Sequence, residues 1–366
     1  MTSRERLLRC IKRKPIDRVP ISVYELCGFD SDSWAYQEPS YARIMEFIRE
    51  KTDCILMVDP VLNDSQTEYI TQSHREGKTV FGDTVWHTPA GDFFQKSRVD
   101  DVIKTTWTLE HFVKSTDDVE RLLSFDWQPL SVDMTSFYVK QRQLGENGIM
   151  MMTLTDPVCE AASLMGMEDF LITALTEQDL MTRFLDMLFE RQLHTLRQIV
   201  KHDVTDVMFR ICGPEYCTPP YMPPELFTKY VTGYVKVYCE LINQAGGISR
   251  VHSHGKVKQV LDDIVETGAM CVDPLEAPPD GDITLAEVKK QYGDKLILFG
   301  NMQLKDLEVK TADQIRQLTR EVLDSAAGGG GFVLLPTATP INIPLSRLTE
   351  NNIITMVETA LEYGQY

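Results

Sequence analysis

The chain has 366 residues, of which 43% are hydrophobic and 25% are charged. This composition is that of a globular protein with a substantial core, and it excludes a disordered or fibrous chain. Asp and Glu outnumber Lys and Arg by 54 to 37, which gives a net charge of -17, so we expect neither nucleic acid nor an anionic membrane as the main partner.

The first predicted element is a helix within residues 1–18. Thr2 and Glu5 have the spacing of a capping box and precede an apolar helical pattern, and Pro15 is expected to end the helix. This helix precedes the main fold.

From residue 19 onward, short apolar segments alternate with amphipathic segments. This alternation is typical of parallel strands joined by crossover helices. Eight segments have the strand pattern, namely residues 19–26, 54–60, 149–156, 206–212, 248–254, 269–276, 296–302 and 332–338. Eight strands with intervening helices favour an α/β fold of the (β/α)8 TIM barrel type over an open sheet, and we expect residues 1–366 to form one such domain.

Residues 62–130, between the second and third predicted strands, are too polar and turn-rich for a single crossover helix. Apolar and polar residues alternate on both sides of the turn sequence PAGD, which predicts β-hairpins. Because this insertion leaves the carboxyl end of the second strand, we expect it to cover the barrel mouth.

Eight cysteines are scattered along the chain without a C-x-x-C pair, which predicts reduced and mostly buried thiols rather than a disulfide scaffold or a zinc ribbon. The amino terminus lacks the apolar stretch of a signal peptide, and no later segment is apolar enough to cross a bilayer. We therefore expect a cytoplasmic protein with no membrane partner.

Polar residues gather at the ends of the predicted strands, where barrels of this class carry their reactive groups. The catalytic candidates are Glu25 after the first strand, Asp59 after the second, Glu215 after the fourth and Asp273 in the sixth. A purely structural core does not require so many carboxylates at one end, because unpaired buried charges are costly. The structural alternative is that Asp273 only holds a loop and that Glu215 is a solvated acid at a helix entry.

His252 and His254 are two positions apart, which places both side chains on one face of the fifth strand. Two imidazoles on one face suit zinc or a similar divalent metal, and Glu276 from the next strand could be the third ligand. The alternative is that one histidine donates a hydrogen bond in a polar barrel mouth while the other caps the following helix.

Six segments that span nearly the whole chain carry a family resemblance: RERLLRCIKRKPIDRVPI, TDPVCEAASLMGMEDFL, MPPELFTKYV, VHSHGKVKQVLDDIVETGAMCVDPLE, LILFGNMQ and TPINIPLSRLTENNIITMVETA. They resemble the uroporphyrinogen decarboxylase superfamily, which includes zinc-dependent methylcobamide methyltransferases and corrinoid-linked O-demethylase methyltransferases. The resemblance implies a (β/α)8 barrel with its site at the carboxyl face.

The sequence departs from the decarboxylases at three places. It has no arginine in SVYELCGFDSDSW, no tyrosine in LTDPVCEAASLMG and no histidine in VLLPTATP, where the decarboxylases carry those residues. Asp59 resembles their aspartate in its position. The methyltransferase branch has a His-x-Cys motif that matches at His252, but His254 stands in place of the cysteine and VLLPTATP supplies no further cysteine. A metal here would have nitrogen and oxygen ligands.

The leading hypothesis is a metal-assisted methyltransferase that moves a methyl group from a small methoxy or methylamine-type donor to a corrinoid protein. The metal would be bound by His252, His254 and Glu276, and a Lewis acid would polarise the leaving group. The corrinoid would come from a partner protein, and a homodimer is compatible with the resemblance. The alternatives are a decarboxylase that uses Asp59 to stabilise positive charge, and a non-catalytic protein that binds a tetrapyrrole or corrinoid.

Overall fold

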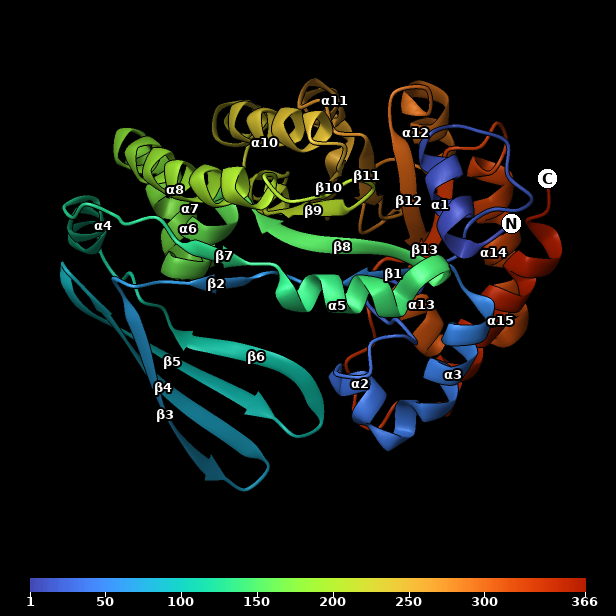
Figure 1. Cartoon of the computed structure of the whole chain (residues 1–366), viewed down its shortest axis with the longest axis horizontal. Coiled ribbons are helices and arrows are strands. Elements are labelled where there is room, and N and C mark those ends of the chain that lie inside the picture. The colour runs from blue at the N-terminus through green and yellow to red at the C-terminus, as the bar shows by residue number, and fades with distance from the viewer.

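The computed structural model describes all of the residues, 1–366. Its central sheet has seven parallel strands in the order β1-β8-β9-β10-β11-β12-β13. These are β1 Cys54–Met57, β8 Gly148–Thr155, β9 Met208–Cys212, β10 Ile248–Ser253, β11 Cys271–Pro274, β12 Ile297–Met302 and β13 Phe332–Pro336. Figure 1 shows that this sheet curls and that helices cover its outside. Seven of the eight predicted strands and the barrel class are therefore confirmed.

The first predicted strand, residues 19–26, is not a regular strand, but it occupies the eighth position. Its residues hydrogen bond to both edges of the sheet: Asp53 N donates to Ile21 O at 2.7 Å on the β1 side, and Ser22 N donates to Leu334 O at 2.9 Å on the β13 side. Pro20 has no N–H to donate, although its carbonyl accepts from Leu334 N at 2.9 Å. The segment thus closes the barrel through isolated hydrogen bonds.

The helices follow the strands in the predicted alternation. They are α1 Ser3–Ile11, α2 Trp34–Gln37, α3 Ala42–Lys51, α4 Thr116–Leu123, α5 Thr135–Leu144, α6 Pro157–Met165, α7 Met167–Thr176, α8 Gln178–Ile199, α9 Pro224–Phe227, α10 Gly233–Gln244, α11 Leu261–Glu266, α12 Leu285–Tyr292, α13 Leu304–Val309, α14 Ala312–Ala326 and α15 Arg347–Tyr363. The Thr2 side chain accepts from Glu5 N at 3.1 Å and so caps α1, as predicted, but α1 ends at Ile11, four residues before Pro15. A bilayer-spanning helix would need more length and more apolar sequence than any helix of this chain has.

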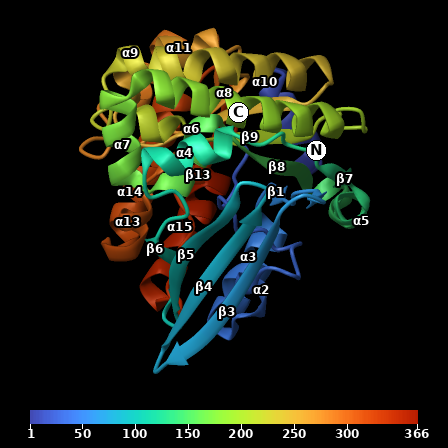
Figure 2. The same ribbon diagram turned by 90° about the vertical axis from the view of Figure 1, so that its left-hand side faces the viewer.

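The insertion after the second barrel position forms its own antiparallel sheet. Strands β3 Glu68–Glu76, β4 Thr79–Thr88, β5 Gly91–Asp100 and β6 Ile103–Glu110 pair in sequence order, and the short strands β2 Val61–Asn63 and β7 Ser131–Asp133 form a separate pair. The predicted hairpins are confirmed, with the turn around PAGD joining β4 to β5. Figure 2 shows this sheet projecting from the barrel as a separate layer.

The barrel interior is apolar at its base and becomes polar toward the carboxyl ends of the strands. A buried cluster takes alternate residues from the strands, including Ile149 and Met151 of β8, Met208 of β9, Ile248 of β10 and Cys271 of β11. Since side chains alternate along a strand, the next inward positions are Arg210, Arg250 and Asp273. The change from apolar to charged residues along the same strands places the polar layer at the barrel mouth.

Candidate functional site

Adjacent strands bring the polar layer together in register. In the sheet, Arg210 of β9 is paired with Arg250 of β10, and His252 of β10 is paired with Asp273 of β11. All four of these residues are buried, with Asp273 fully so. Three of the groups carry charges at neutral pH, so each must find a partner within the barrel.

Asp273 is the acceptor at the centre of this layer. Arg250 donates to it from Nε and from Nη2, each at 2.6 Å, and His252 Nδ1 lies 2.9 Å from Oδ2. Burial alone would raise the pKa of Asp273, but the charge of Arg250 and the bond from His252 outweigh burial and hold the pKa well below its usual range. Asp273 is therefore a structural anion that orients His252.

The partners of His252 define its tautomer. Arg210 Nη2 lies 3.1 Å from His252 Nε2, and a guanidinium can only donate, so Nε2 accepts and the ring proton lies on Nδ1, facing Asp273. Burial, together with the charge of Arg210, lowers the pKa of His252. His252 is thus a neutral imidazole, and both of its nitrogens are engaged.

Arg210 connects this buried layer to the surface. Its Nη1 donates to Glu25 Oε1 at 2.7 Å, its Nη2 donates to the Tyr24 hydroxyl at 2.5 Å, and its guanidinium lies 5.0 Å from the centroid of the Tyr24 ring. Glu25 is exposed. The chain of contacts runs from Glu25 through Arg210 and His252 to Asp273.

His254 and Glu276 form a second pair beyond the end of β10. His254 Nδ1 lies 3.2 Å from Glu276 Oε1, and Gly255 N donates to Glu276 Oε2 at 2.8 Å. Burial disfavours the charged imidazole, but the hydrogen bond and charge of Glu276 outweigh it and raise the pKa of His254. His254 is partly exposed, and its Nε2 has no hydrogen-bond partner in the protein. It is the histidine at the mouth that can carry a transferable proton.

The other predicted acids lie on the rim. Glu215 is in a 3-10 turn, Pro214–Cys217, where its Oε2 accepts from Gly213 N at 3.0 Å, and its charge acts on both His252 and His254. Asp59 follows β1 and its Oδ1 accepts from Thr153 N at 2.6 Å. The structure therefore places all of the predicted residues at the carboxyl end of the barrel, but only His252, Asp273, His254 and Glu276 pair with one another.

The three predicted metal ligands do not form a metal site in this arrangement. His252 Nδ1 faces Asp273 and its Nε2 accepts from Arg210, so neither nitrogen has a lone pair directed at a shared ion. The rings of His252 and His254 stand edge to face, 4.7 Å between centroids, and no group of three or more His, Cys, Asp or Glu side chains is arranged to hold a metal. Zinc binding stays a prediction.

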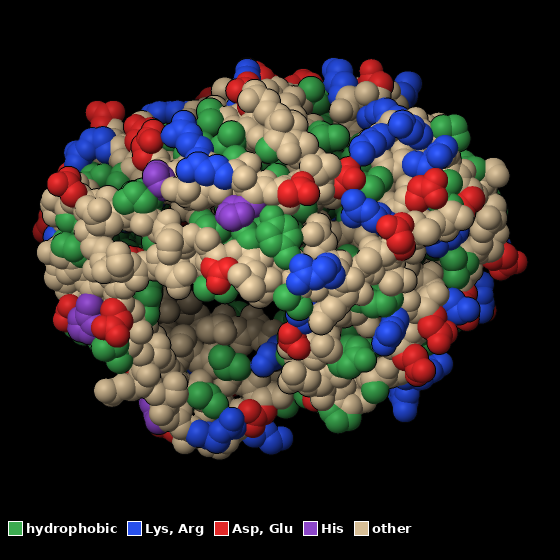
Figure 3. Space-filling model, in the orientation of Figure 1, with side chains coloured by type: hydrophobic (Ala, Val, Ile, Leu, Met, Phe, Trp, Pro, Cys, Tyr) green, Lys and Arg blue, Asp and Glu red, His purple; other side chains and the backbone are tan.

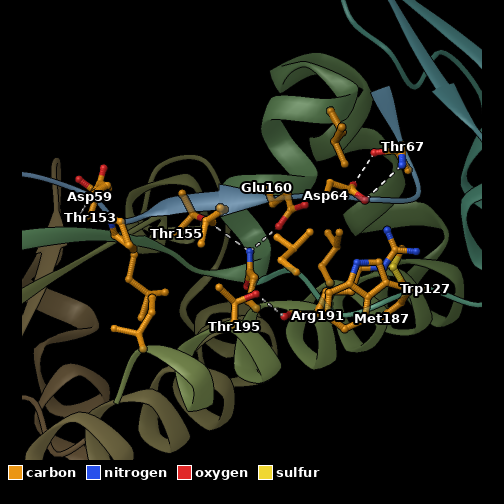
Figure 4. Close-up of a pocket in the computed structure, with 18 of the residues that line it drawn as sticks. Asp59, Asp64, Thr67, Trp127, Thr153, Thr155, Glu160, Met187, Arg191 and Thr195 are labelled. Carbon is orange, nitrogen blue, oxygen red and sulfur yellow. Dashed lines mark hydrogen bonds between the residues drawn. The ribbon is translucent and has the colours of Figure 1, made fainter. Parts of the chain in front are cut away.

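A pocket of about 530 Å³ opens beside this layer. Its walls come from the ends of β1 and β8, from α8 and from the insertion, and Figure 4 shows Asp59 and Thr153 at one end and Asp64 and Trp127 at the other. Figure 3 shows a deep hollow in the surface between the insertion sheet and the barrel. Since Thr153 is paired with Arg210 in the sheet, the pocket adjoins the polar layer.

The sequence over residues 98–362 matches the pattern of the family described as uroporphyrinogen decarboxylase (URO-D). The chain belongs to the URO-D family. No curated protein sequence matches it at a significant level. Among solved structures it is similar to a methyltransferase from Methanosarcina mazei, with a TM-score of 0.62 and 15% identity over 99% of both chains. A D-psicose 3-epimerase aligns over 67% of this chain and 84% of its own, at 9% identity and with a TM-score of only 0.32.

In this member of the URO-D family, three residues of the polar layer were missed as site candidates from sequence. Arg250 lies two positions before His252, so strand alternation alone could have placed it beside the histidine. Arg210 likewise lies two positions before Cys212 on β9, the strand next to β10. No sequence pattern could place Tyr24 at the site, because it lies in the closing segment, which is not a regular strand, and its φ is 49°.

Proposed function

We propose that this URO-D family chain is a methyltransferase that passes a methyl group from a small methoxy or methylamine-type donor to a corrinoid carried by a partner protein. The proposal is supported by the likeness of its fold to the Methanosarcina mazei methyltransferase over nearly the whole of both chains. The observation that carries it is a partly exposed histidine at the barrel mouth, His254, whose pKa is raised by Glu276.

Methyl transfer leaves an electron pair on the atom that releases the methyl group. A reduced corrinoid held by the partner would supply the electron pair for the new bond to the methyl carbon, and the pair of the broken bond would stay on the leaving oxygen or nitrogen. A proton from His254 Nε2 would neutralise the developing charge on that atom, and Glu276 would stabilise the imidazolium before transfer. His254 would thus stabilise the leaving group as a general acid, in the role that a Lewis acid would have in a relative with a thiolate-bound metal.

The remaining residues of the mouth would position the donor. Arg210 is fixed by Glu25, Tyr24 and His252, so its guanidinium presents a fixed positive edge beside the rim. Such a preorganised group costs no reorganisation when charge changes during the reaction. Asp59 and Glu215 lie on loops at the same end of the barrel, after β1 and β9.

The test is methyl transfer from methoxy and methylamine donors to a free corrinoid in its reduced form, monitored by the absorbance of the corrinoid. We expect His254→Gln to lower kcat by roughly a hundredfold or more, with less loss for donors whose leaving group is a weak base. His202→Gln, an exposed histidine far along the chain, is the matched control and should react as the unaltered protein does.

Two results would count against the proposal. Equal rates for the His254 and His202 variants would remove His254 as the acid. Release of carbon dioxide from carboxylated pyrroles, with no methyl transfer from any donor, would instead assign the chain to decarboxylation.

A further inference from the structure

The pocket between the insertion and α8 has aromatic walls. Tyr69 and Trp86 of the insertion stack with ring centroids 5.4 Å apart and an interplanar angle of 8°, and Trp127 lines the same pocket. Figure 4 shows Trp127 beside Met187 of α8. Flat walls of this kind favour a flat apolar ligand.

The same pocket contains most of the buried hydrogen-bond donors that have no partner in the protein. Trp86 Nε1 and the Nε and Nη2 atoms of Arg191 are buried without a hydrogen bond, and the one other such donor is Arg210 Nε. An unpaired buried donor is destabilising, so three around one pocket indicate that a ligand supplies the acceptor.

Arg191 is held in place without its hydrogen bonds. Its guanidinium lies 5.0 Å from the centroid of the Phe125 ring, which fixes the plane by a cation–π contact. The Nε and Nη2 atoms form one edge of the guanidinium, and two parallel N–H groups on an edge match the two oxygens of a carboxylate.

The nearby acids are already engaged. Asp64 accepts from Gln66 N at 2.7 Å and from the Thr67 hydroxyl at 2.5 Å, and Glu160 Oε2 accepts from Gln192 at 2.6 Å. Burial raises the pKa of Glu160 and lowers that of Arg191. Neither acid forms a salt bridge with Arg191. An incoming anion would therefore supply the counter-charge that the desolvated guanidinium lacks.

We propose that this pocket binds a planar, apolar molecule that carries one carboxylate, with the carboxylate on Arg191 and the ring system between the aromatic walls. Binding itself does not depend on methyl transfer. That the bound molecule is the methyl donor rests on the proposed function, and is supported by Asp59 and Thr153, which line both the pocket and the rim of the polar layer.

The test is isothermal titration calorimetry of the purified chain, without any corrinoid, against benzoate, 2-naphthoate and indole-3-acetate, and against 2-naphthamide as the neutral counterpart of the naphthoate. We expect at least one carboxylate to saturate the protein at about millimolar concentration or below, and 2-naphthamide to bind at least about tenfold more weakly than 2-naphthoate. Arg191→Met should weaken the carboxylates by about tenfold to a hundredfold and leave the amide unchanged.

Matched variants separate the pocket from a general effect. Arg183→Met removes an exposed arginine of the same helix, which pairs with Glu120, and should bind the probes as the unaltered protein does. Trp86→Phe keeps a ring but removes the N–H and should weaken the carboxylates a few-fold, whereas Trp107→Phe on the exposed side should not. Arg191→Lys keeps the charge but lacks the planar edge. Its affinity for the carboxylates provides the test if Arg191→Met does not fold.

The proposal is overturned if no planar carboxylate saturates the protein, if the amide binds as tightly as the acid, or if Arg191 variants that fold bind the acid unchanged. Carboxylate binding can be observed when methyl transfer is absent, and methyl transfer can be observed when carboxylate binding is absent. The two proposals are therefore tested separately.

Discussion

Asp273 balances the buried charges at the barrel mouth, and its replacement should be costly. Asn in its place would leave the guanidinium of Arg250, which is 2% exposed, without a counter-charge. Removing one partner of a buried ion pair costs about 3–5 kcal/mol, so Asp273→Asn should lower the free energy of unfolding by that amount in urea denaturation at neutral pH. Asp313→Asn, which alters an exposed carboxylate paired with Arg316, should change it little. A loss below about 1 kcal/mol for Asp273→Asn would show that Arg250 finds another partner.

The raised pKa of His254 also makes a prediction about pH. Glu276, Glu215 and Asp273 are the carboxylates whose charges act on it, and His252 packs against its ring. A histidine whose pKa is higher in the folded state contributes stability below its unfolded pKa of about 6.5, and this contribution disappears as the pH rises through the folded pKa.

Urea denaturation of the unaltered protein and of His254→Gln should therefore differ more at about pH 5.5 than at about pH 9. Glu276 remains ionised at the lower pH, because the bond from His254 outweighs burial and lowers its pKa. The exposed His202→Gln should show no such trend. A difference that grows toward high pH would contradict the assigned direction of the shift.

At the residue scale, the sequence predicted where the polar groups would gather but not how they would pair. Strand alternation predicted His252 and His254 on one face of the fifth strand, and the structure pairs His252 with Asp273 of the next strand in the sheet. Spacing along one strand could not show whether His252 is free to bind a metal, because its Nε2 lone pair accepts from Arg210 of another strand. Such a contact depends on side-chain conformations across the barrel, which spacing along one strand does not encode.

At the scale of elements, the turn after β9 depends on a glycine next to the start of α6. Asp156 caps α6 by accepting from Cys159 N at 2.7 Å, and a Cβ on Gly213 would lie 1.8 Å from Asp156 Oδ1. Gly213 also has a φ of 131°, which residues with a side chain rarely adopt.

Gly213→Ala should therefore destabilise the protein by at least about 2 kcal/mol in thermal or urea unfolding. Gly233→Ala is the matched control, because Gly233 begins α10 with helical dihedrals and open space around it. That substitution should stabilise the protein by about 0.4–1 kcal/mol. Similar effects of the two substitutions would mean that the turn relaxes around the new methyl group.

The elements that the sequence predicted best are those with strong local periodicity. The seven regular strands and the antiparallel insertion follow from hydrophobic patterns. The first barrel segment has the same composition as a strand, but Pro20 and the turn at Tyr24 and Glu25 prevent a continuous ladder. The pocket formed by the insertion and α8 could not be predicted, because Trp86 and Arg191 are brought together only by the packing of distant elements.

At the scale of the whole molecule, one buried carboxylate closes the barrel. Asp53 is fully buried; its Oδ1 lies 2.6 Å from Arg6 Nη1, and its Oδ2 lies 2.7 Å from Arg18 Nη1 and accepts from Ile21 N at 2.9 Å. These bonds tie α1 and the closing segment to β1, and the closing segment also bonds to β13. The Asp53 side chain thus reinforces the backbone bonds by which the closing segment joins the two ends of the sheet order.

Asp53→Asn should loosen both edges of the sheet at once. Arg18 would lose its counter-charge and Arg6 one of its two, so we expect the free energy of unfolding to fall by about 3–5 kcal/mol. Hydrogen exchange should show lost protection in both β1 and β13, which lie far apart in sequence, before it appears in the central strand β10. Asp17→Asn is the matched control, because Asp17 binds the same Arg6 but is 44% exposed, and it should cost about 1 kcal/mol or less. Loss of protection in β1 alone would mean that the closing segment is held to β13 independently of Asp53.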